Sequence, residues 1–183
     1  ADTSMEHQAL TIDADGNLGY AEAGTATGDL VSAGIVSAVC GFAPIIVDYR
    51  PTNQADYPDA NNWSINAQRQ IIGQFGNGDY AIITSEGRNY QNSDGWTLTE
   101  AQAVCQRYGL KFAYNLDGGG STETVLGYKH INTIYEGETG RKVPTFIVFN
   151  GESTFDKENE RIPSGYTELS YVDSSAGGIY INT

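Results

Sequence analysis

Phe112-Ala113-Tyr114-Asn115-Leu116-Asp117-Gly118-Gly119-Gly120-Ser121-Thr122 is the stretch of this sequence that decides the fold. Its first three residues predict a buried strand, which runs into three consecutive glycines. Glycines at the end of a strand permit unusual backbone angles and let a ligand reach the main chain. Successive amides in such a loop can form a concave anion site, and Ser121 and Thr122 add hydroxyl donors. Asp117 lies beside them as a potential acid, base or nucleophile.

The same loop also has a purely structural interpretation, which is a tight glycine turn that holds no ligand. It is not a nucleotide-binding P-loop, because the Gly-Lys-Ser/Thr ending of that motif is absent. A helix is expected before it, since Thr97-Leu98-Thr99-Glu100 forms a capping box in which hydroxyl and carboxylate bind free amides. Gly109 is expected to end that helix. Its predicted apolar face comprises Leu98, Ala101, Cys105 and Tyr108.

Most of the remaining chain is predicted to form strands and turns. The strongest hairpin signal joins residues 70–75 to residues 80–84 through the turn Gly76-Asn77-Gly78-Asp79. A second hairpin joins residues 9–12 to residues 18–20, with Asp and Gly residues supplying the turn. Further strands are expected at residues 44–47, 123–126, 145–149 and 179–181, a short helix at residues 29–40, and a polar loop at residues 51–66.

This order of elements predicts the fold class. Strands outnumber helices without a regular alternation, so the chain is expected to be an α+β protein with a mixed, mainly antiparallel sheet and a few packing helices. The 183 residues, 39% of them hydrophobic, suit a single domain over residues 1–183. Twelve Tyr and 22 Gly against one Met also favour strands and turns over a helical bundle.

The charge excludes some partners. The net charge is −13, and the ten Lys and Arg residues form no cluster, so nucleic-acid binding is not expected. No apolar run approaches the length of a membrane-spanning helix, so membrane insertion is not expected either. The acidity fits an extracellular, cell-surface or virion location. No cofactor is indicated, and no residues have a convincing metal-ligand spacing.

The two cysteines, Cys40 and Cys105, are far apart in the sequence and lack the spacing of a metal site. The simplest interpretation is two buried thiols, because free cysteine is often a core residue. A disulfide between them is the alternative in an oxidising compartment.

Four segments follow one another along the chain: Arg69-Gln70-Ile71-Ile72-Gly73, Glu86-Gly87-Arg88, Gly95-Trp96-Thr97-Leu98 and the loop from Asn115 to Thr122. In this order they resemble the phosphodiester glycosidase family, which has animal, bacterial and phage members. The resemblance covers about residues 69 to 149. Glu86 stands where the family usually has Asp, and the family's N-terminal Asn-Gly-Gly-Phe/Tyr-Phe segment is not found. The domain is therefore expected to lack its N-terminal segment and to be part of a longer protein.

The resemblance implies a hydrolase that cleaves the bond between a sugar and a phosphodiester in a glycan, cell-wall or capsule substrate. Such chemistry needs charge stabilisation on the phosphate and a carboxylate near the anomeric carbon. Asp117 is the predicted catalytic carboxylate, with Glu86 second. Arg69 and Arg88 are predicted to bind the phosphate. The other predicted substrate-binding residues are Asn115, Gly118, Gly119, Gly120, Ser121 and Thr122.

Other interpretations stay open. The chain is alternatively a catalytically idle module that binds glycans, or a structural part, in a phage tail or surface assembly that includes other chains. Arg88 and Glu86 could form a surface ion pair, Arg69 could be solvated, and Asn115 could cap a turn. The remaining charges are interpreted as surface groups, and His130 as a structural or exposed residue without an evident partner; these charges are Lys129, Arg141 and Lys142.

Overall fold

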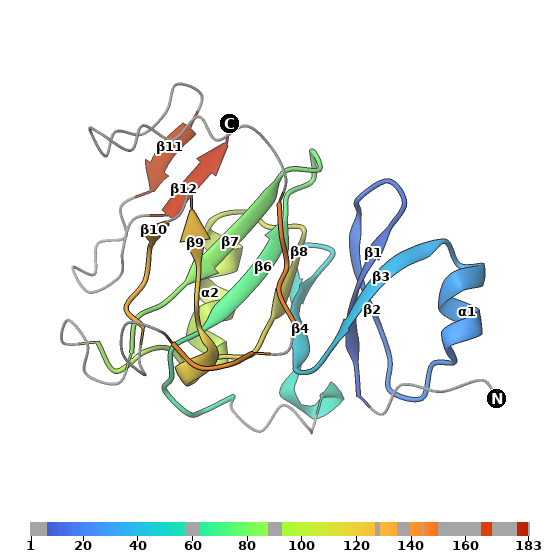
Figure 1. Cartoon of the computed structure of the whole chain (residues 1–183), viewed down its shortest axis with the longest axis horizontal. Helices are drawn as coiled ribbons and strands as arrows, with labels where there is room; N and C mark the ends of the chain where they lie inside the picture. Colours follow the sequence, from blue (N-terminus) through green and yellow to red (C-terminus); the bar gives the residue numbers. More distant parts are fainter. Residues whose placement is uncertain are drawn as a thin grey trace.

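The centre of the molecule is a five-stranded antiparallel sheet with the strand order β5-β4-β8-β6-β7 (Figure 1). The structure is a computed structural model, and it describes residues 7–57, 63–87, 93–126, 129–134, 140–143, 145–149, 166–169 and 179–182. The α+β class and the mainly antiparallel sheet are confirmed. The strands are β4 (Ala43–Val47), β5 (Arg50–Pro51), β6 (Gln70–Gln74), β7 (Tyr80–Thr84) and β8 (Phe112–Asn115).

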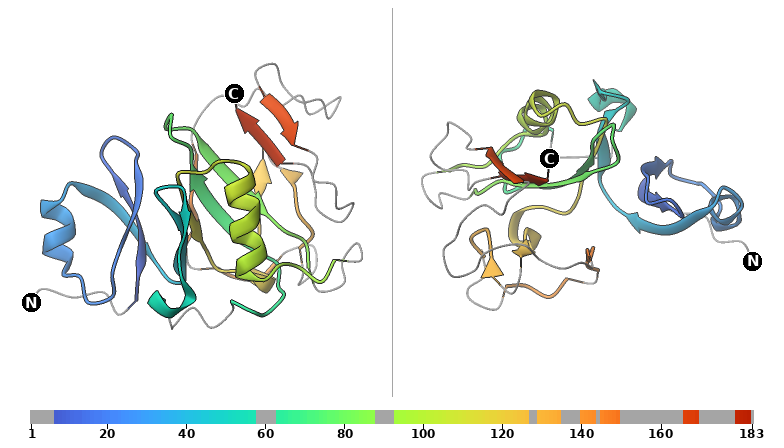
Figure 2. Two further views of the ribbon diagram at one scale, coloured as in Figure 1. Left: turned by 180° about the vertical axis from the view of Figure 1, so that it is seen from behind. Right: turned by 90° about the horizontal axis from the view of Figure 1, so that it is seen from above.

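Helix α2 (Leu98–Arg107) covers one face of this sheet (Figure 2). Both bonds of the predicted capping box are formed: Thr97 Oγ1 accepts from the Glu100 amide at 3.1 Å, and Glu100 Oε2 accepts from the Thr97 amide at 2.8 Å. The helix packs on isoleucines of β4, β6 and β7. The predicted apolar face is confirmed, since Leu98, Ala101 and Cys105 are buried and Tyr108 is partly buried.

A three-stranded sheet with the order β2-β1-β3 packs against the opposite face of the five-stranded sheet. Leu10 and Leu18 join Ile72, Phe112 and Tyr114 in one buried cluster. The Gln74 side chain ties the two sheets together, because its Oε1 accepts from the Leu18 amide at 2.9 Å and its Nε2 donates to the Gly16 carbonyl at 3.2 Å. The predicted first hairpin is confirmed. The strands are β1 (Ala9–Asp13), β2 (Leu18–Ala21) and β3 (Ile35–Cys40).

The predicted helix over residues 29–40 is wrong. Only α1 (Thr27–Ser32) is helical, and the residues from Ile35 onward form β3. Gly34, with φ at +79°, lets the chain turn after the helix, and β3 then pairs antiparallel with β1. The β-branched residues of this stretch suit a strand, and pairing with β1 outweighs the helical spacing of its apolar residues.

Shorter elements follow the glycine loop on the face opposite α2 (Figure 2). A small hairpin joins β9 (Val125–Leu126) to β10 (Lys129–His130), so the strand expected at residues 123–126 is confirmed only in its last two residues. The strand expected at residues 145–149 is wrong, since these residues lie in no strand. The expected strand near the end of the chain is confirmed as β12 (Ile179–Asn182), paired with β11 (Tyr166–Leu169) beside β7.

The two cysteines are both free thiols. Cys105 is buried on the sheet-facing side of α2, and burial raises the pKa of its thiol to about 12. Cys40 is exposed at the end of β3, which corrects the expectation that both are buried. Within the described residues, no helix combines the length and apolar character needed to cross a membrane.

Candidate active site

The predicted site segments meet at one end of the five-stranded sheet. β6 is antiparallel to both β7 and β8, so the start of β6 lies beside the ends of its two neighbours. The ladder continues beyond the strands, because the Ser85 amide donates to the Arg69 carbonyl at 3.0 Å. On the other side, the Gly119 amide donates to the Gln68 carbonyl at 2.9 Å. The sheet topology therefore brings residues 68–69, 85–87 and 115–119 together.

Three glycines of the family segments pack against the main chain that leads into β6. A Cβ on Gly118 would lie 2.5 Å from the Gln68 carbonyl oxygen, and one on Gly87 would lie 2.7 Å from the Gln68 amide. A Cβ on Gly95 would lie 2.3 Å from the Ala67 carbonyl oxygen. Only glycine allows such close contact between segments. The three segments that contain these glycines thus all pack against the backbone of residues 67–68.

Arg69 is buried on the α2 side of this sheet end. Its Nε donates to the Trp96 carbonyl at 2.8 Å, and its guanidinium also donates to the Ile65 carbonyl. Burial lowers the pKa of Arg69 from its usual value. The alternative that Arg69 is solvated is therefore wrong. The described contacts tie its charge to the carbonyls of two loops, and its contact with a phosphate stays a prediction.

Glu86 is also buried, with 5% of its surface exposed, so it is not part of a surface ion pair. Its Oε1 accepts from the Thr133 amide at 2.8 Å, and its Oε2 lies 3.5 Å from Gln68 Nε2. Arg88 lies outside the described residues, and its predicted role stays untested. The Glu86 carboxylate is thus bound by two segments of the chain, through the Thr133 amide and the Gln68 side chain.

Glu86 belongs to a chain of polar contacts that the sequence did not indicate. Gln68 Nε2 donates to the Thr133 carbonyl at 3.3 Å. Asn132 Nδ2 donates to the Thr122 carbonyl at 2.9 Å, and Asn132 Oδ1 accepts from the Thr124 amide at 2.8 Å. These contacts fasten the chain after the glycine loop to the sheet end. The partners are 8 to 65 positions apart in the sequence, so no local pattern indicates these contacts.

The glycine loop presents the Asp117 carboxylate to solvent. Asp117 is exposed, and its Oδ1 accepts from the Gly118 amide at 2.9 Å. The turn η2 (Gly119–Ser121) follows, in which the Ser121 amide donates to the Gly118 carbonyl and the Thr122 amide to the Gly119 carbonyl, each at 3.1 Å. The amides of the loop thus bind protein atoms at Leu116, Gly118, Gly119, Ser121 and Thr122. Binding of an anion by the loop amides stays a prediction. The Asp117 carboxylate is the group of the loop that is accessible to a ligand.

Buried oxygens without a protein partner border the loop. Asn115 and Thr122 are 1% and 2% exposed. Within the described residues, Asn115 Oδ1, Thr122 Oγ1 and Gln68 Oε1 have no hydrogen-bond partner. Most buried polar atoms in proteins are hydrogen-bonded. These three oxygens next to the loop are therefore exceptions that can still accept a hydrogen bond.

The predicted residues divide between the two faces of the sheet. Side chains alternate along a strand, so Arg69 and Asn115 face α2 together with Ile71. Glu86 faces the other way, together with Gln68. Asp117 lies beyond the end of β8, at the edge between these faces. The structure thus brings the predicted residues to one sheet end but separates the buried arginine from the buried glutamate.

The charged residues near the loop include one pair that the sequence did not indicate. His130 Nδ1 lies 3.3 Å from Glu123 Oε1, so His130 has a partner after all. Across the described ranges, no group of three or more His, Cys, Asp or Glu side chains is arranged to hold a metal ion.

The sequence pattern of the phosphodiester glycosidase family matches residues 2–150. The chain belongs to the phosphodiester glycosidase family. The fold agrees with that of the zebrafish N-acetylglucosamine-1-phosphodiester alpha-N-acetylglucosaminidase catalytic domain, auto-inhibited by its pro-peptide, with a TM-score of 0.53 at 15% identity. That match covers 97% of this chain and 52% of the zebrafish chain.

A phage-derived relative of this phosphodiester glycosidase chain is also found. The SPbeta prophage-derived uncharacterized protein YomE of Bacillus subtilis (strain 168) is 28% identical over 138 residues. The match covers 74% of this chain and 21% of that protein, so the chain spans only a small part of the relative.

Proposed function

We propose that the chain is a glycosidase-type hydrolase that cleaves a sugar-1-phosphodiester, between the anomeric carbon and the phosphate oxygen. The observation that carries this proposal is the meeting of the four family segments at one sheet end, with Asp117 exposed there. Family membership supports the reaction class. The name of the zebrafish relative supports N-acetylglucosamine-1-phosphodiester as the first substrate to assay.

The proposed reaction needs little acid assistance. The phosphate leaves as a weakly basic anion, which keeps the electron pair of the broken C–O bond, while a water oxygen forms the new bond to the anomeric carbon. The products are a free sugar and a phosphomonoester, and the water supplies the protons. The transition state carries positive charge at the anomeric carbon, which an adjacent carboxylate stabilises.

Asp117 suits that role better than Glu86. Asp117 is exposed and bound by a single described amide donor, so a substrate can reach its carboxylate. Glu86 is buried and holds the Thr133 amide, which suits a residue that positions the site. Thr122 carries a buried hydroxyl oxygen that can accept or share a hydrogen bond from a sugar hydroxyl, whereas Asn115 faces α2 and its contact with a sugar stays a prediction.

The test is the turnover of an N-acetylglucosamine-1-phosphodiester by the wild-type protein, Asp117→Asn and Asp15→Asn. Asp15 is an exposed carboxylate in the β1–β2 turn, near the far end of β6, and serves as the matched control. We expect Asp117→Asn to lower kcat by about a hundredfold or more, in the range of lost catalytic groups, and Asp15→Asn to leave it unchanged. Equal turnover by all three proteins would contradict the role of Asp117.

The second candidate function is a catalytically idle glycan-binding or structural module of a phage tail or surface assembly. The prophage origin of one relative favours it. It predicts that the wild-type protein binds phosphorylated glycans or cell-wall polymers without releasing sugar, and that Asp117→Asn binds equally well. An extracellular, cell-surface or virion location belongs to both proposals, and fractionation of the producing cells and particles would test it.

A further inference from the structure

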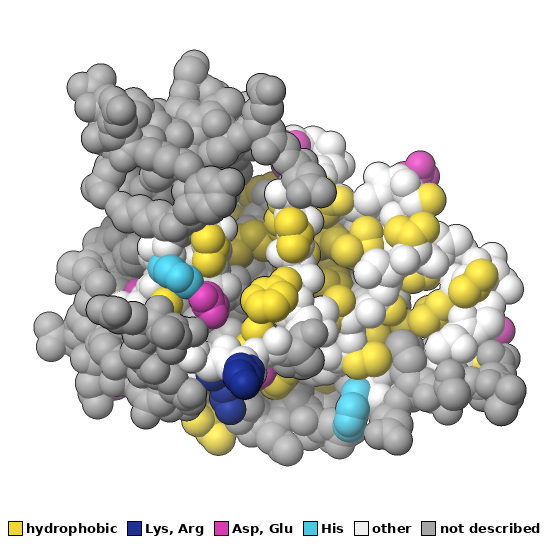
Figure 3. All heavy atoms as spheres, in the orientation of Figure 1, with side chains coloured by type: hydrophobic (Ala, Val, Ile, Leu, Met, Phe, Trp, Pro, Cys, Tyr) yellow, Lys and Arg dark blue, Asp and Glu magenta, His cyan; other side chains and the backbone are white. Residues whose placement is uncertain are grey.

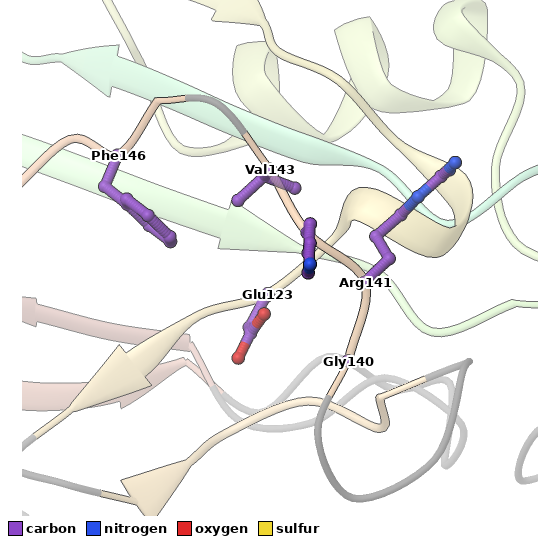
Figure 4. A pocket seen from close by; sticks show the side chains of 6 residues that line it. Glu123, Gly140, Arg141, Val143 and Phe146 are labelled. Carbon is purple, nitrogen blue, oxygen red and sulfur yellow. The ribbon is translucent and has the colours of Figure 1, made fainter.

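A cavity of about 590 Å³ opens beside the glycine loop, on the face of the sheet opposite α2 (Figure 4). Glu123, which directly follows the loop residue Thr122, forms one wall, and residues 140–143 with Phe146 form the other. Sites for small ligands usually have volumes of about 300–1,000 Å³. The cavity is thus large enough for a sugar phosphate. Its lining residues are Glu123, Gly140, Arg141, Lys142, Val143 and Phe146.

Gly140 allows the two walls to approach. Its φ is +60°, and an added Cβ would lie 3.1 Å from Glu123 Oε2 and 3.3 Å from Ile134 Cγ2. A side chain there would be strained at this φ, and the Glu123 carboxylate and Ile134 would each have to shift slightly. The turn at Gly140 thus places Arg141 and Lys142 next to Glu123.

The cavity gives an acidic protein a local positive charge. The chain carries a net charge of −13, so its overall field repels a phosphodiester. Arg141 and Lys142 are consecutive basic residues, and Figure 3 shows Lys and Arg side chains gathered at one place on this face. The Glu123 side chain points away from Arg141 in Figure 4, and its Oε1 lies 3.3 Å from His130 Nδ1. The carboxylate that forms the acidic wall of the cavity is thus paired with His130.

Phe146 supplies an apolar surface at the same cavity. Its side chain is 71% exposed although it lines the cavity. An exposed ring beside polar and charged groups suits the apolar face of a sugar ring. A charged group and an aromatic ring together match a ligand that combines phosphate and sugar.

We propose that this cavity binds the phosphate and the adjoining sugar of the substrate, with Lys142 attracting the phosphate and Phe146 contacting the sugar ring. The inference rests on the proposed function and assigns its substrate-binding subsite. It adds a ligand-binding role for Lys142, which is exposed as the sequence indicated. It also provides a basic group for the phosphate on the face of the sheet opposite α2, away from the buried Arg69.

Calorimetric titration with N-acetylglucosamine-1-phosphate, and with uncharged N-acetylglucosamine, tests the subsite directly. We expect Lys142→Gln to raise the Kd of the phosphate about tenfold or more without affecting the uncharged sugar. Lys111→Gln is the matched control, since Lys111 is exposed at the opposite end of β6. Phe146→Leu should weaken both ligands, while Phe149→Leu, outside the cavity lining, should weaken neither. Equal Kd values for the wild type and Lys142→Gln, or no binding at all, would overturn the subsite.

Turnover assays separate this inference from the proposed function. Binding that depends on Lys142 in a protein that never releases sugar would support the subsite and contradict the hydrolase. Turnover in which Lys142→Gln and Phe146→Leu leave KM unchanged would overturn the subsite and leave the hydrolase standing. A higher KM with nearly constant kcat supports both.

Discussion

At the scale of single residues, glycines determine how closely the site segments approach. Gly87, Gly95 and Gly118 are far apart in the sequence, yet each lies against the backbone of residues 67–68. A glycine in a motif is often explained by flexibility, but the contact distances here indicate close packing of main chains. The family pattern thus contains structural residues as well as the carboxylate that performs chemistry.

Gly95→Ala tests this close packing. Gly95 and Gly24 have nearly the same φ, +86° and +87°, but a Cβ on Gly24 would meet nothing within 4 Å. The backbone strain of alanine is therefore similar at both positions, and only Gly95→Ala adds a clash with Ala67. We expect Gly95→Ala to lower the free energy of unfolding by about 1–3 kcal/mol more than Gly24→Ala does. Equal losses in denaturant unfolding would show that residues 67 and 95 do not touch.

Asp13 provides a pH-dependent test of the first hairpin. The Asn17 side chain and then its amide, both donating to Asp13, lower the pKa of that carboxyl below 3.8. A lowered pKa in the folded state means that the contribution is complete above pH 3.8 and is lost as the pH falls through the folded value. The stability difference between the wild type and Asp13→Asn should therefore shrink only under acid conditions. A difference that does not change with pH would contradict the hydrogen bonds at Asp13.

At the scale of elements, local signals were predictable from the sequence and long-range pairing was not. The helix at α2 and the hairpin of β6 and β7 follow from capping and turn residues. β3 has apolar residues at helical spacing and becomes a strand because β1 is available to pair with it. The strand expected at residues 145–149 lacks such a partner within the described part of the chain.

The same division applies to the candidate site. Asp117 and the glycine loop are local in the sequence, so the family resemblance finds them. The burial of Arg69 and Glu86, and their contacts with Trp96 and Thr133, depend on segments that meet only in the folded sheet. The lining role of Lys142 likewise depends on the approach of Gly140 to Glu123. No periodicity in the sequence carries that information.

The start of α2 is the element whose prediction can be measured most simply. Thr97→Ala removes the hydroxyl that accepts from the Glu100 amide, and we expect a loss of about 1 kcal/mol in the free energy of unfolding. Thr99→Ala is the control, because Thr99 is exposed in the same turn of the helix and alanine favours helices. If chemical denaturation gives the same loss for both variants, the capping box does not stabilise α2.

At the scale of the whole molecule, the chain forms three layers. α2 lies behind the five-stranded sheet, and the front layer contains the three-stranded sheet on one side and β9, β10 and residues 140–143 and 145–149 on the other (Figures 1 and 2). The candidate site lies where the end of the middle layer meets the front layer. Residues that face α2, such as Arg69 and Asn115, support this end, whereas Asp117 and the cavity beside it are open to a ligand.

The central claim is that this sheet end, and no other surface, binds the sugar phosphodiester. The most direct measurement is a crystal structure of the Asp117→Asn variant with an uncleaved N-acetylglucosamine-1-phosphodiester. We predict that the anomeric carbon lies beside position 117 and that the phosphate lies in the cavity near Lys142. A ligand bound elsewhere, for example on the outer face of β3, with the glycine loop unoccupied, would contradict the claim.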